Sequence, residues 1–285
     1  MGCTREDLMN LFAGAGIKKD PKVFESISHI FTAWSVYFST LAALDFLHED
    51  LKGRIYVLQG FGNVGSEYCK FMYKKGARLL AVSTRAGAIY NKKGIDVGEI
   101  LELRKKYGDK FVLEYKKGER IDGEKLIELD VDIAVPCARC WAIDSNNVER
   151  IKAKIIPCAA NVAMDLDIEK KLILQNKIVI PDFVANCGGC FGTSIMYCLT
   201  NKSIYKILKK TYKKRVSNLI NKSGKTGETI SELAVREMTK KTGTYGTKKS
   251  EPVSHLNLRG IFKKIIPYLK KQPVLCWYYS RKFFQ

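Results

Sequence analysis

A glycine-rich run of six residues is the clearest chemical signal in this 285-residue sequence. The run consists of Gly60, Phe61, Gly62, Asn63, Val64 and Gly65. Its three glycines suit a dinucleotide site, because the first permits a tight turn, the second lets a pyrophosphate approach the backbone, and the third lets a helix pack closely on a strand. A tight strand–helix turn without a ligand is the alternative interpretation.

The segments on either side of the run determine how it should be interpreted. Residues 55–58 form a short apolar stretch bounded by glycines, which is typical of a buried parallel strand, and residues 67–73 continue as a helix. The N-terminus of such a helix offers free N–H groups and the positive end of its dipole to a pyrophosphate. The sequence therefore predicts a nucleotide site between this strand and this helix.

The end of the next predicted strand indicates which nucleotide is preferred. An NAD site usually carries Asp or Glu there to bind the ribose 2′-hydroxyl. Here the run at 79–82 is followed by Ser83, Thr84 and Arg85. A carboxylate would repel a 2′-phosphate, whereas a hydroxyl beside a guanidinium can bind one. We expect NADP in preference to NAD; the alternative is that Arg85 is an ordinary solvated loop residue.

Two C-x-x-C pairs could bind a metal instead. Cys137 with Cys140, and Cys187 with Cys190, each follow a predicted strand, and their spacing is compatible with a tetrahedral zinc site. Free cysteine also behaves as a small hydrophobic residue, so we expect no metal and keep zinc as the alternative. Nine cysteines without regular spacing indicate a reducing compartment, and we expect a cytoplasmic protein.

Strand and helix patterns alternate along the first 200 residues. Strand-like runs lie at 55–58, 79–82, 132–135, 154–156 and 178–180, with a hairpin arm at 88–90. Helical patterns lie at 30–47, 97–107, 124–128, 148–152 and 166–176, and the chain is helical after Gly189. This alternation predicts an α/β fold with a doubly wound, Rossmann-like, mainly parallel sheet and helical N- and C-terminal extensions.

The expected domains are a helical extension at 1–29, a nucleotide-binding domain at 30–200, helices at 201–246 and a basic aromatic tail at 247–285. The formal net charge is +20, yet residues 201–285 hold 21 Lys and Arg against four Glu, so the basicity belongs to the C-terminal part. Such a segment can bind nucleic acid, but Lys-rich helices are usually solvated faces, and we do not expect nucleic-acid binding. We also expect no membrane span.

Several further motifs stand at fixed positions relative to the glycine run. They are residues 51–53, 59–65, 82–83, 87–90, 136–138, 161 and 181–189. In order and spacing they resemble the cofactor-binding domain of the glutamate/leucine/phenylalanine/valine dehydrogenases, and glutamate dehydrogenase most closely. The resemblance implies that an amino acid is oxidatively deaminated to a 2-oxo acid and ammonia, with hydride passing to the nicotinamide.

Individual roles follow from the resemblance alone. Thr32 matches a threonine near the nicotinamide amide, and Thr193 matches a serine that touches the substrate carboxylate. Asn161 matches an asparagine on the ribose side of the cofactor, and Asn186 falls in the loop that closes the cleft. Cys137 and Ala138 match a cofactor-binding run. For the two asparagines, turn chemistry is the alternative.

The sequence also departs from the family pattern. Ala33 and Ser35 replace glycines, Thr84 replaces the usual Asp, and Cys140 with Trp141 replaces an acid or amide followed by asparagine. The family's substrate domain, with its catalytic lysine and aspartate, has no counterpart in residues 1–29. We therefore expect no catalytic residue in this chain.

Three hypotheses on function remain open. In the first, the chain is the cofactor part of a glutamate-dehydrogenase-type oxidoreductase, either truncated as given or completed by a separate polypeptide that carries the substrate domain. The expected partners are this polypeptide or further copies of the chain in a homo-oligomer. In the second, it is a degenerate, non-catalytic NAD(P)-binding protein. In the third, it is an interaction protein in which the old fold carries the basic tail, and the tail makes the interaction.

Overall fold

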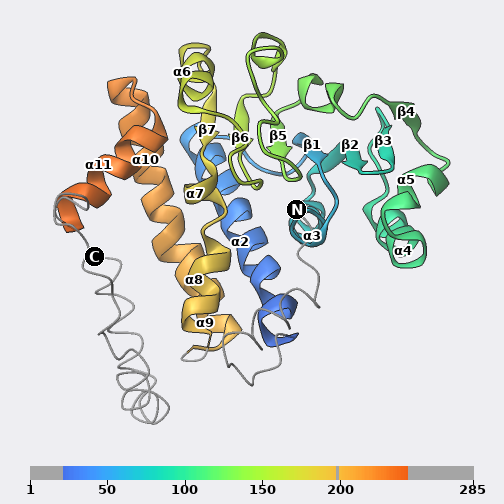
Figure 1. Cartoon of the computed structure of the whole chain (residues 1–285), viewed down its shortest axis with the longest axis horizontal. Coiled ribbons are helices and arrows are strands. Elements are labelled where there is room, and N and C mark those ends of the chain that lie inside the picture. The colour runs from blue at the N-terminus through green and yellow to red at the C-terminus, as the bar shows by residue number, and fades with distance from the viewer. Residues whose placement is uncertain (1–21, 197–198, 243–285) are drawn as a thin grey trace, which may run out of the picture.

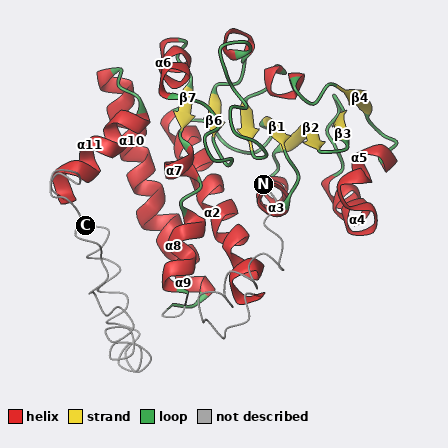
Figure 2. Ribbon diagram, viewed as in Figure 1, coloured by secondary structure: helices red, strands yellow, loops and turns green. Residues whose placement is uncertain are grey.

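The computed structural model describes residues 22–196 and 199–242 (Figure 1). The first part of the expected N-terminal extension and the whole basic aromatic tail at 247–285 lie outside the described residues. Helices flank a central sheet, as Figure 2 shows by colour. The α/β architecture expected from the alternating patterns is therefore confirmed.

The sheet has seven strands in the order β4-β3-β2-β1-β5-β6-β7. They are β1 (Ile55–Gln59), β2 (Arg78–Thr84), β3 (Gly87–Tyr90), β4 (Glu119–Ile121), β5 (Ile133–Pro136), β6 (Ile155–Pro157) and β7 (Ile178–Ile180). Strand β1 pairs in parallel with β2 and with β5, and the parallel pairing continues through β6 to β7. The β2–β3 and β3–β4 pairs are antiparallel, so of these seven strands β3 alone runs opposite to the others. The chain thus crosses over from one side of β1 to the other, which creates a switch point at the carboxyl end of β1.

Helices cover both faces of the sheet and continue beyond it. Those described are α2 (Lys22–Phe46), α3 (Asn63–Lys74), α4 (Val97–Tyr107), α5 (Phe111–Glu114), α6 (Leu166–Leu174), α7 (Asp182–Ala185), α8 (Gly188–Ile195), α9 (Asn201–Ile207), α10 (Lys213–Thr226) and α11 (Ile230–Thr242). A π-helical turn, Leu208–Tyr212, joins α9 to α10.

Alternate residues of β1 face two separate hydrophobic clusters, as the twofold period of a strand requires. Leu58 packs in the cluster that contains Phe38 of α2, and Val57 packs in the cluster that contains Leu172 of α6. All four of these side chains are buried. Both faces of the sheet are therefore covered, which explains why β1 is apolar throughout rather than alternating.

Helix α2 is the central helix of one layer. Its segment Ile27–Phe46 has a mean hydropathy of 1.3, so by length and composition alone it could cross a membrane, but 61% of that apolar window is buried inside the fold. It lies beside α8 and α10, which pack along it (Figure 1). This burial is that of a core helix. The helix begins at Lys22, ahead of the expected domain boundary at residue 30.

Two expected α-helices are wrong in type, and one strand was not expected. Residues 124–128 and 148–152 were expected to be α-helical, but they form the short 3₁₀ turns Lys125–Glu128 and Val148–Arg150. Segments this short cannot repay the cost of nucleating an α-helix. Strand β4 has only three residues, none of them buried, so its sequence carries little strand signal.

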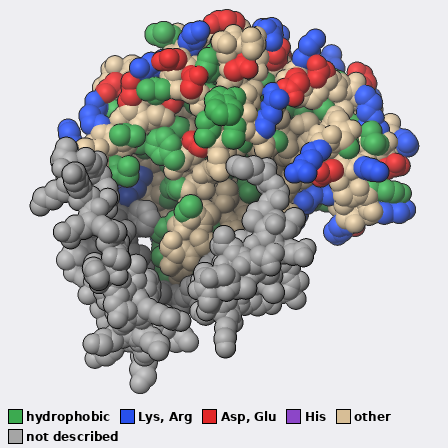
Figure 3. Space-filling model, in the orientation of Figure 1, with side chains coloured by type: hydrophobic (Ala, Val, Ile, Leu, Met, Phe, Trp, Pro, Cys, Tyr) green, Lys and Arg blue, Asp and Glu red, His purple; other side chains and the backbone are tan. Residues whose placement is uncertain are grey.

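Charges of both signs lie along the outer part of the visible face of the described residues, and hydrophobic side chains and backbone occupy its middle (Figure 3). Figure 3 shows Lys and Arg side chains mixed with Asp and Glu over the top and right of this face. The described surface in this view carries no broad field of one sign, unlike the basic stripe expected of a nucleic-acid-binding surface.

Candidate functional site

The glycine run forms the turn between β1 and α3. Gly60 has φ +111°, a conformation that side-chain-bearing residues rarely adopt. A Cβ at Gly60 would also lie 2.8 Å from the Cβ of Ala138 and 3.0 Å from the carbonyl carbon of Cys137. The turn therefore requires glycine at this position for two independent reasons.

The other two glycines differ in what surrounds them. A Cβ at Gly65 would collide with the carbonyl oxygen of Gly60, so helix α3 can approach the turn only with glycine there. A Cβ at Gly62 would meet nothing within 4 Å. Gly62 is also the N-cap of α3 and supplies no side-chain acceptor to the first N–H groups. Open space at an uncapped helix N-terminus is what a pyrophosphate needs.

The loop after β5 closes this turn from the side. The N–H of Cys137 donates to the carbonyl oxygen of Gln59 at 2.9 Å. The Cys137 thiol would lie 3.5 Å from a Cβ at Gly65, and Ala138 lies against Gly60. The structure therefore brings Cys137 and Ala138, both expected at the cofactor, to the glycine turn.

The cysteine arrangement expected for zinc is not formed. Within 22–196 and 199–242, no group of three or more His, Cys, Asp or Glu side chains is placed to hold a metal ion. Burial raises the pKa of the Cys137 thiol, and equally that of Cys187, to about 12. Both thiols are therefore protonated at neutral pH and behave as small hydrophobic groups.

The end of β2 places Ser83, Thr84 and Arg85 in three different environments. Ser83 is buried and pairs in register with Gln59 of β1. The Thr84 hydroxyl donates to the carbonyl oxygen of Asp109 at 2.8 Å and accepts the N–H of Ala86 at 3.1 Å. It therefore fixes the turn, and its proton is already engaged. Arg85 is exposed, so its guanidinium is accessible to a 2′-phosphate.

Arg104 of α4 is a site residue that the sequence reasoning missed. Its guanidinium donates to Ser66 Oγ at 2.9 Å and to Asn63 Oδ1 at 3.2 Å, and it lies 5.9 Å from the centre of the Phe61 ring. A positive charge at the first turn of α3 adds to the attraction of the helix dipole for phosphate. The sequence offers no local signal for it, since Arg104 lies in a helix that also carries Lys105 and Lys106.

The loops after β6 and β7 are tied together at the carboxyl edge of the sheet. The Asn186 side-chain amide donates to Asn161 Oδ1 at 2.8 Å, and the N–H of Val162 donates to Asp182 Oδ2 at 2.7 Å. The two asparagines assigned by resemblance are thus direct partners. They lie on the side of the sheet where open α/β folds bind their ligands.

Two bulky residues hold an unusual backbone conformation at the same edge. Trp141 has φ +48° and Val162 has φ +50°, and the N–H of Trp141 donates to the carbonyl oxygen of Val162 at 2.7 Å. The left-handed region is costly for a β-branched residue, and such strain collects at functional sites. Trp141 is 59% exposed, so its indole stands in solvent beside the site.

Thr32 and Thr193 lie on two helices that are packed unusually closely. A Cβ at Gly188 or Gly192 of α8 would collide with Phe31 of α2, so these glycines set the distance between the helices. The Thr193 hydroxyl donates to the carbonyl oxygen of Gly189, and a Cβ at Gly189 would press on the Thr32 hydroxyl. The two threonines therefore flank Gly189, each bonded within its own helix.

Comparison with known proteins agrees with this geometry. A family model described as Glutamate/Leucine/Phenylalanine/Valine dehydrogenase matches residues 26–251. The chain belongs to this dehydrogenase family. Over 164 residues it is 39% identical to the glutamate dehydrogenase of Aeropyrum pernix, covering 58% of this chain and 39% of that protein. Over 148 residues it is 43% identical to the Thermotoga maritima enzyme, covering 52% of this chain and 35% of that protein.

A solved member of the dehydrogenase family shares the fold. The hetero-hexameric glutamate dehydrogenase of Thermus thermophilus, with leucine bound, aligns with a TM-score of 0.63 at 21% identity, over 76% of this chain and 54% of that one. At this identity the likeness shows the fold alone. The chain spans less than two fifths of the length of the two curated relatives.

Other relatives in the family differ in cofactor. One at 35% identity is an NADP-specific glutamate dehydrogenase from Saccharolobus shibatae, and another at 35% is an NAD-specific enzyme from Bacillus subtilis. Sequence similarity therefore does not decide between the two nucleotides for this chain. The choice has to be argued from the residues at the end of β2 and at the start of α3.

Proposed function

We propose that this chain binds a nicotinamide dinucleotide at the Gly60–Gly65 turn and forms the cofactor part of a glutamate-dehydrogenase-like oxidoreductase. The open space at Gly62, in front of the uncapped N-terminus of α3, carries the proposal. A Cβ at this position would meet no atom of the chain within 4 Å, so the space in front of the helix N-terminus is open to a pyrophosphate.

Different residues around the turn are assigned to different parts of the nucleotide. In this proposal the N–H groups at the start of α3 and the Arg104 guanidinium hold the phosphates. Exposed Arg85 favours NADP, because its guanidinium can pair with a 2′-phosphate. Residues 83–85 at this strand end contain no carboxylate that would repel that phosphate. The bonded pair Asn161 and Asn186 fixes the loops beside the nicotinamide half.

The reaction proposed follows from the named activity of the relatives. A bound nicotinamide would supply the acceptor for hydride from the Cα–H of an amino acid, and the overall reaction with water would give a 2-oxo acid, ammonium, the reduced cofactor and one proton. Thr193, beside Gly189 on α8, is proposed to contact the substrate carboxylate. The cofactor supplies the hydride acceptor, and the described residues bind and orient it.

The groups that move protons are proposed to come from elsewhere. By resemblance to the family, a lysine and an aspartate of a substrate domain perform that chemistry. We propose that a substrate domain, on a separate polypeptide or in a homo-oligomer, brings these groups to the carboxyl edge of the sheet. Six free cysteines in the described part suit a reducing compartment such as the cytoplasm.

One feature favours a second candidate, a nucleotide-binding protein without catalysis. Trp141, which is 59% exposed, stands in the loop after β5 where the family pattern has asparagine. In that case the chain would bind nucleotide but show no turnover, even when a substrate domain is supplied.

The test is a titration of the full chain with NADPH and with NADH, followed by a reductive-amination assay with 2-oxoglutarate and ammonium. The proposal expects both nucleotides to bind, NADPH the more tightly, and turnover only when a substrate-domain polypeptide is added. Failure of both nucleotides to bind would contradict the cofactor assignment. Turnover by the chain alone would contradict the proposal that the proton-transfer groups are not supplied by this chain.

A further inference from the structure

Three exposed apolar side chains lie on neighbouring segments at the carboxyl edge of the sheet. Trp141 follows β5, Val162 follows β6, and Phe183 belongs to α7 after β7; each is between 45% and 59% exposed. The N–H of Trp141 donates to the carbonyl oxygen of Val162, and the N–H of Val162 donates to Asp182 Oδ2, each at 2.7 Å. The three segments are therefore joined at this group, the apolar platform. Exposed apolar side chains gathered in one place indicate a binding surface.

The backbone at two residues of the apolar platform is unfavourable for the side chains it carries. Trp141 has φ +48° and Val162 has φ +50°. Asn, which the family pattern has at position 141, tolerates the left-handed region better than Trp does. An indole that is mostly exposed gains little from burial to offset this cost. Strain without a matching gain in stability indicates a functional role for the Trp141 side chain.

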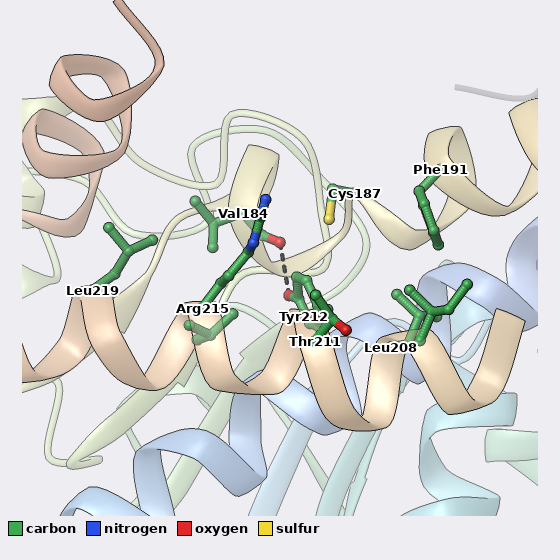
Figure 4. A pocket seen from close by; sticks show the side chains of 10 residues that line it. Val184, Cys187, Phe191, Leu208, Thr211, Tyr212, Arg215 and Leu219 are labelled. Carbon is green, nitrogen blue, oxygen red and sulfur yellow. Dashed lines mark hydrogen bonds between the residues drawn. The ribbon is translucent and has the colours of Figure 1, made fainter. Parts of the chain in front are cut away.

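A hydrogen bond from another layer fixes α7, the helix that carries Phe183. The Tyr212 hydroxyl donates to the carbonyl oxygen of Val184 in α7 at 2.7 Å, beside a small apolar pocket (Figure 4). Tyr212 also shares a hydrogen bond with Ser39 of α2 at 2.5 Å. Because α2 is a core helix, the apolar platform is tied to the body of the fold and needs little reorganisation to receive a ligand.

The apolar platform adjoins both halves of the proposed nucleotide site. Ala138, three residues before Trp141, lies against Gly60 of the pyrophosphate turn. Val162 directly follows Asn161, which is proposed to lie beside the nicotinamide half. The loop after β5 therefore leads from the pyrophosphate toward the nicotinamide, and the nicotinamide ring is the flat group of the cofactor expected at Trp141.

The oxidised and reduced nicotinamide rings differ in charge. The oxidised ring is a pyridinium with a formal positive charge, whereas the reduced ring is neutral. The face of an indole attracts cations, more strongly than the rings of Tyr and Phe do, and the attraction is larger where water is excluded. Val162 and Phe183 provide apolar surface of the kind that excludes water. An indole at this place therefore distinguishes the two forms of the ring, which an asparagine would not.

We propose that the indole of Trp141 stacks on the oxidised nicotinamide ring, with Val162 and Phe183 beside it, and raises the affinity for NADP⁺ relative to NADPH. This inference rests on the proposed function, because it requires a dinucleotide at the Gly60–Gly65 turn. Such a preference favours capture of NADP⁺ and release of NADPH, as oxidative deamination requires.

The binding experiment titrates the full chain with NADP⁺, with NADPH and with 2′-phospho-ADP-ribose, which has the pyrophosphate but no nicotinamide. Trp141→Leu keeps an apolar side chain. It is expected to weaken NADP⁺ binding by about fivefold or more, to weaken NADPH binding by less than about twofold, and to leave 2′-phospho-ADP-ribose unchanged. Trp141→Phe is expected to fall between Trp141→Leu and the parent. Tyr73→Leu removes an exposed ring at the far end of α3 and should change none of the three.

Tryptophan fluorescence gives a second readout of the contact. NADP⁺ does not absorb at the emission wavelength of tryptophan, so it quenches by contact rather than by energy transfer. NADP⁺ is expected to quench part of the emission of the parent chain and none of that of Trp141→Leu, whereas 2′-phospho-ADP-ribose is expected to quench neither. Quenching of the same depth in Trp141→Leu would overturn the contact.

Trp141→Asn tests the backbone strain separately. Because Asn tolerates the left-handed region, this variant is expected to unfold at a higher urea concentration than the parent while it loses NADP⁺ affinity. A Trp141→Asn chain that is less stable than the parent would show that the indole is kept for packing and would overturn the functional interpretation of the strain.

The remaining outcomes separate this inference from the proposed function. Equal weakening of NADP⁺ and NADPH in Trp141→Leu, or weaker binding of 2′-phospho-ADP-ribose, would overturn the role of ring charge, since Trp141 would then only hold its loop. If no nucleotide binds to the parent chain, the proposed function fails and this inference with it. If the nucleotides bind and the Trp141 variants bind them as the parent does, this inference alone fails. Loss of self-association in those variants would then assign the apolar platform to a second copy of the chain.

Discussion

The Asn186 amide donates a hydrogen bond to Asn161 Oδ1 at 2.8 Å and joins the loop after β7 to the loop after β6. A second contact of the same amide reaches the carbonyl oxygen of Ala159 at 3.4 Å. Together with the bond from the Val162 N–H to Asp182, the Asn186–Asn161 bond ties these two segments to each other at the carboxyl edge of the sheet. In the proposed function, this pair orders the loops beside the nicotinamide half of the cofactor.

Breaking this pair should weaken nucleotide binding without unfolding the chain. Asn186→Ala and Asn161→Ala are each expected to lower NADPH affinity by about fivefold, equivalent to about 1 kcal/mol for one hydrogen bond. Because both variants remove the same bond, the double variant should lose little more than either alone. Fully additive losses in a calorimetric double-mutant cycle would show that the two asparagines act independently. Asn221→Ala, on the exposed face of α10, is the control.

Arg85 and Arg104 should affect the two nucleotides differently. Arg85→Gln is expected to weaken NADPH binding by about tenfold and to leave NADH unchanged, since only NADPH carries a 2′-phosphate. Arg104→Gln is expected to weaken both, because its guanidinium lies at the first turn of α3. Lys105→Gln, an exposed neighbour paired with Glu102, is the matched control. An NADH loss equal to the NADPH loss in Arg85→Gln would remove the argument for NADP.

Gly65 should matter for folding rather than for binding alone. Gly65→Ala places a methyl group against the carbonyl oxygen of Gly60, so either α3 or the turn must shift. The free energy of unfolding is expected to fall by about 1–3 kcal/mol, as for other overpacked sites. Urea denaturation followed by circular dichroism measures this. A Gly65→Ala chain as stable as the parent would mean that α3 is not held against the turn as described.

Glu169 should make stability depend on pH. Its carboxylate is 3% exposed and accepts hydrogen bonds from the Ser231 N–H and hydroxyl at the start of α11. Burial raises the pKa of Glu169 above its ordinary value. The neighbouring charge of Glu232 also raises this pKa, whereas the hydrogen bonds from Ser231 lower it. A raised carboxyl pKa means that the protonated form is favoured in the folded state. This contribution is therefore present at acidic pH and is lost as the pH rises through the folded-state pKa.

Glu169→Gln is expected to remove that contribution to pH dependence. Between about pH 4 and pH 7, the loss of unfolding free energy with rising pH should be smaller in the variant than in the parent. A Glu169→Gln profile that coincides with the parent's would show that this carboxylate titrates in the folded chain as it does in the unfolded one.

Much of the nucleotide turn could be predicted, because its determinants are local. The apolar run before Gly60 and the helical pattern after Gly65 establish the order strand, turn and helix without knowledge of the rest of the fold. The bounds of α4 were also predicted as observed, since Asp96 caps its start and Gly108 ends it. Local signals of this kind survive folding because tertiary packing reinforces them.

What could not be predicted depends on distant packing or on rare conformations. Arg104 reaches Asn63 only because α4 packs against α3, and no spacing in the sequence encodes that contact. Trp141 and Val162 adopt positive φ although their side chains disfavour it, so no turn rule identifies them. The Thr84 hydroxyl, expected to be available to phosphate, is bonded to the carbonyl oxygen of Asp109 in the 3₁₀ turn Gly108–Lys110, which the sequence analysis did not anticipate.

The central claim is that the open space at Gly62 holds the pyrophosphate. Gly62 has φ −74°, which any residue adopts, and no atom lies within 4 Å of a Cβ built there, so larger side chains can be introduced without disturbing the fold. In calorimetric titrations with NADPH, Gly62→Ala is expected to weaken binding, and Gly62→Val to abolish it, while both keep the parent's unfolding free energy within about 1 kcal/mol. A normally folded Gly62→Val chain that binds NADPH as tightly as the parent would contradict the account.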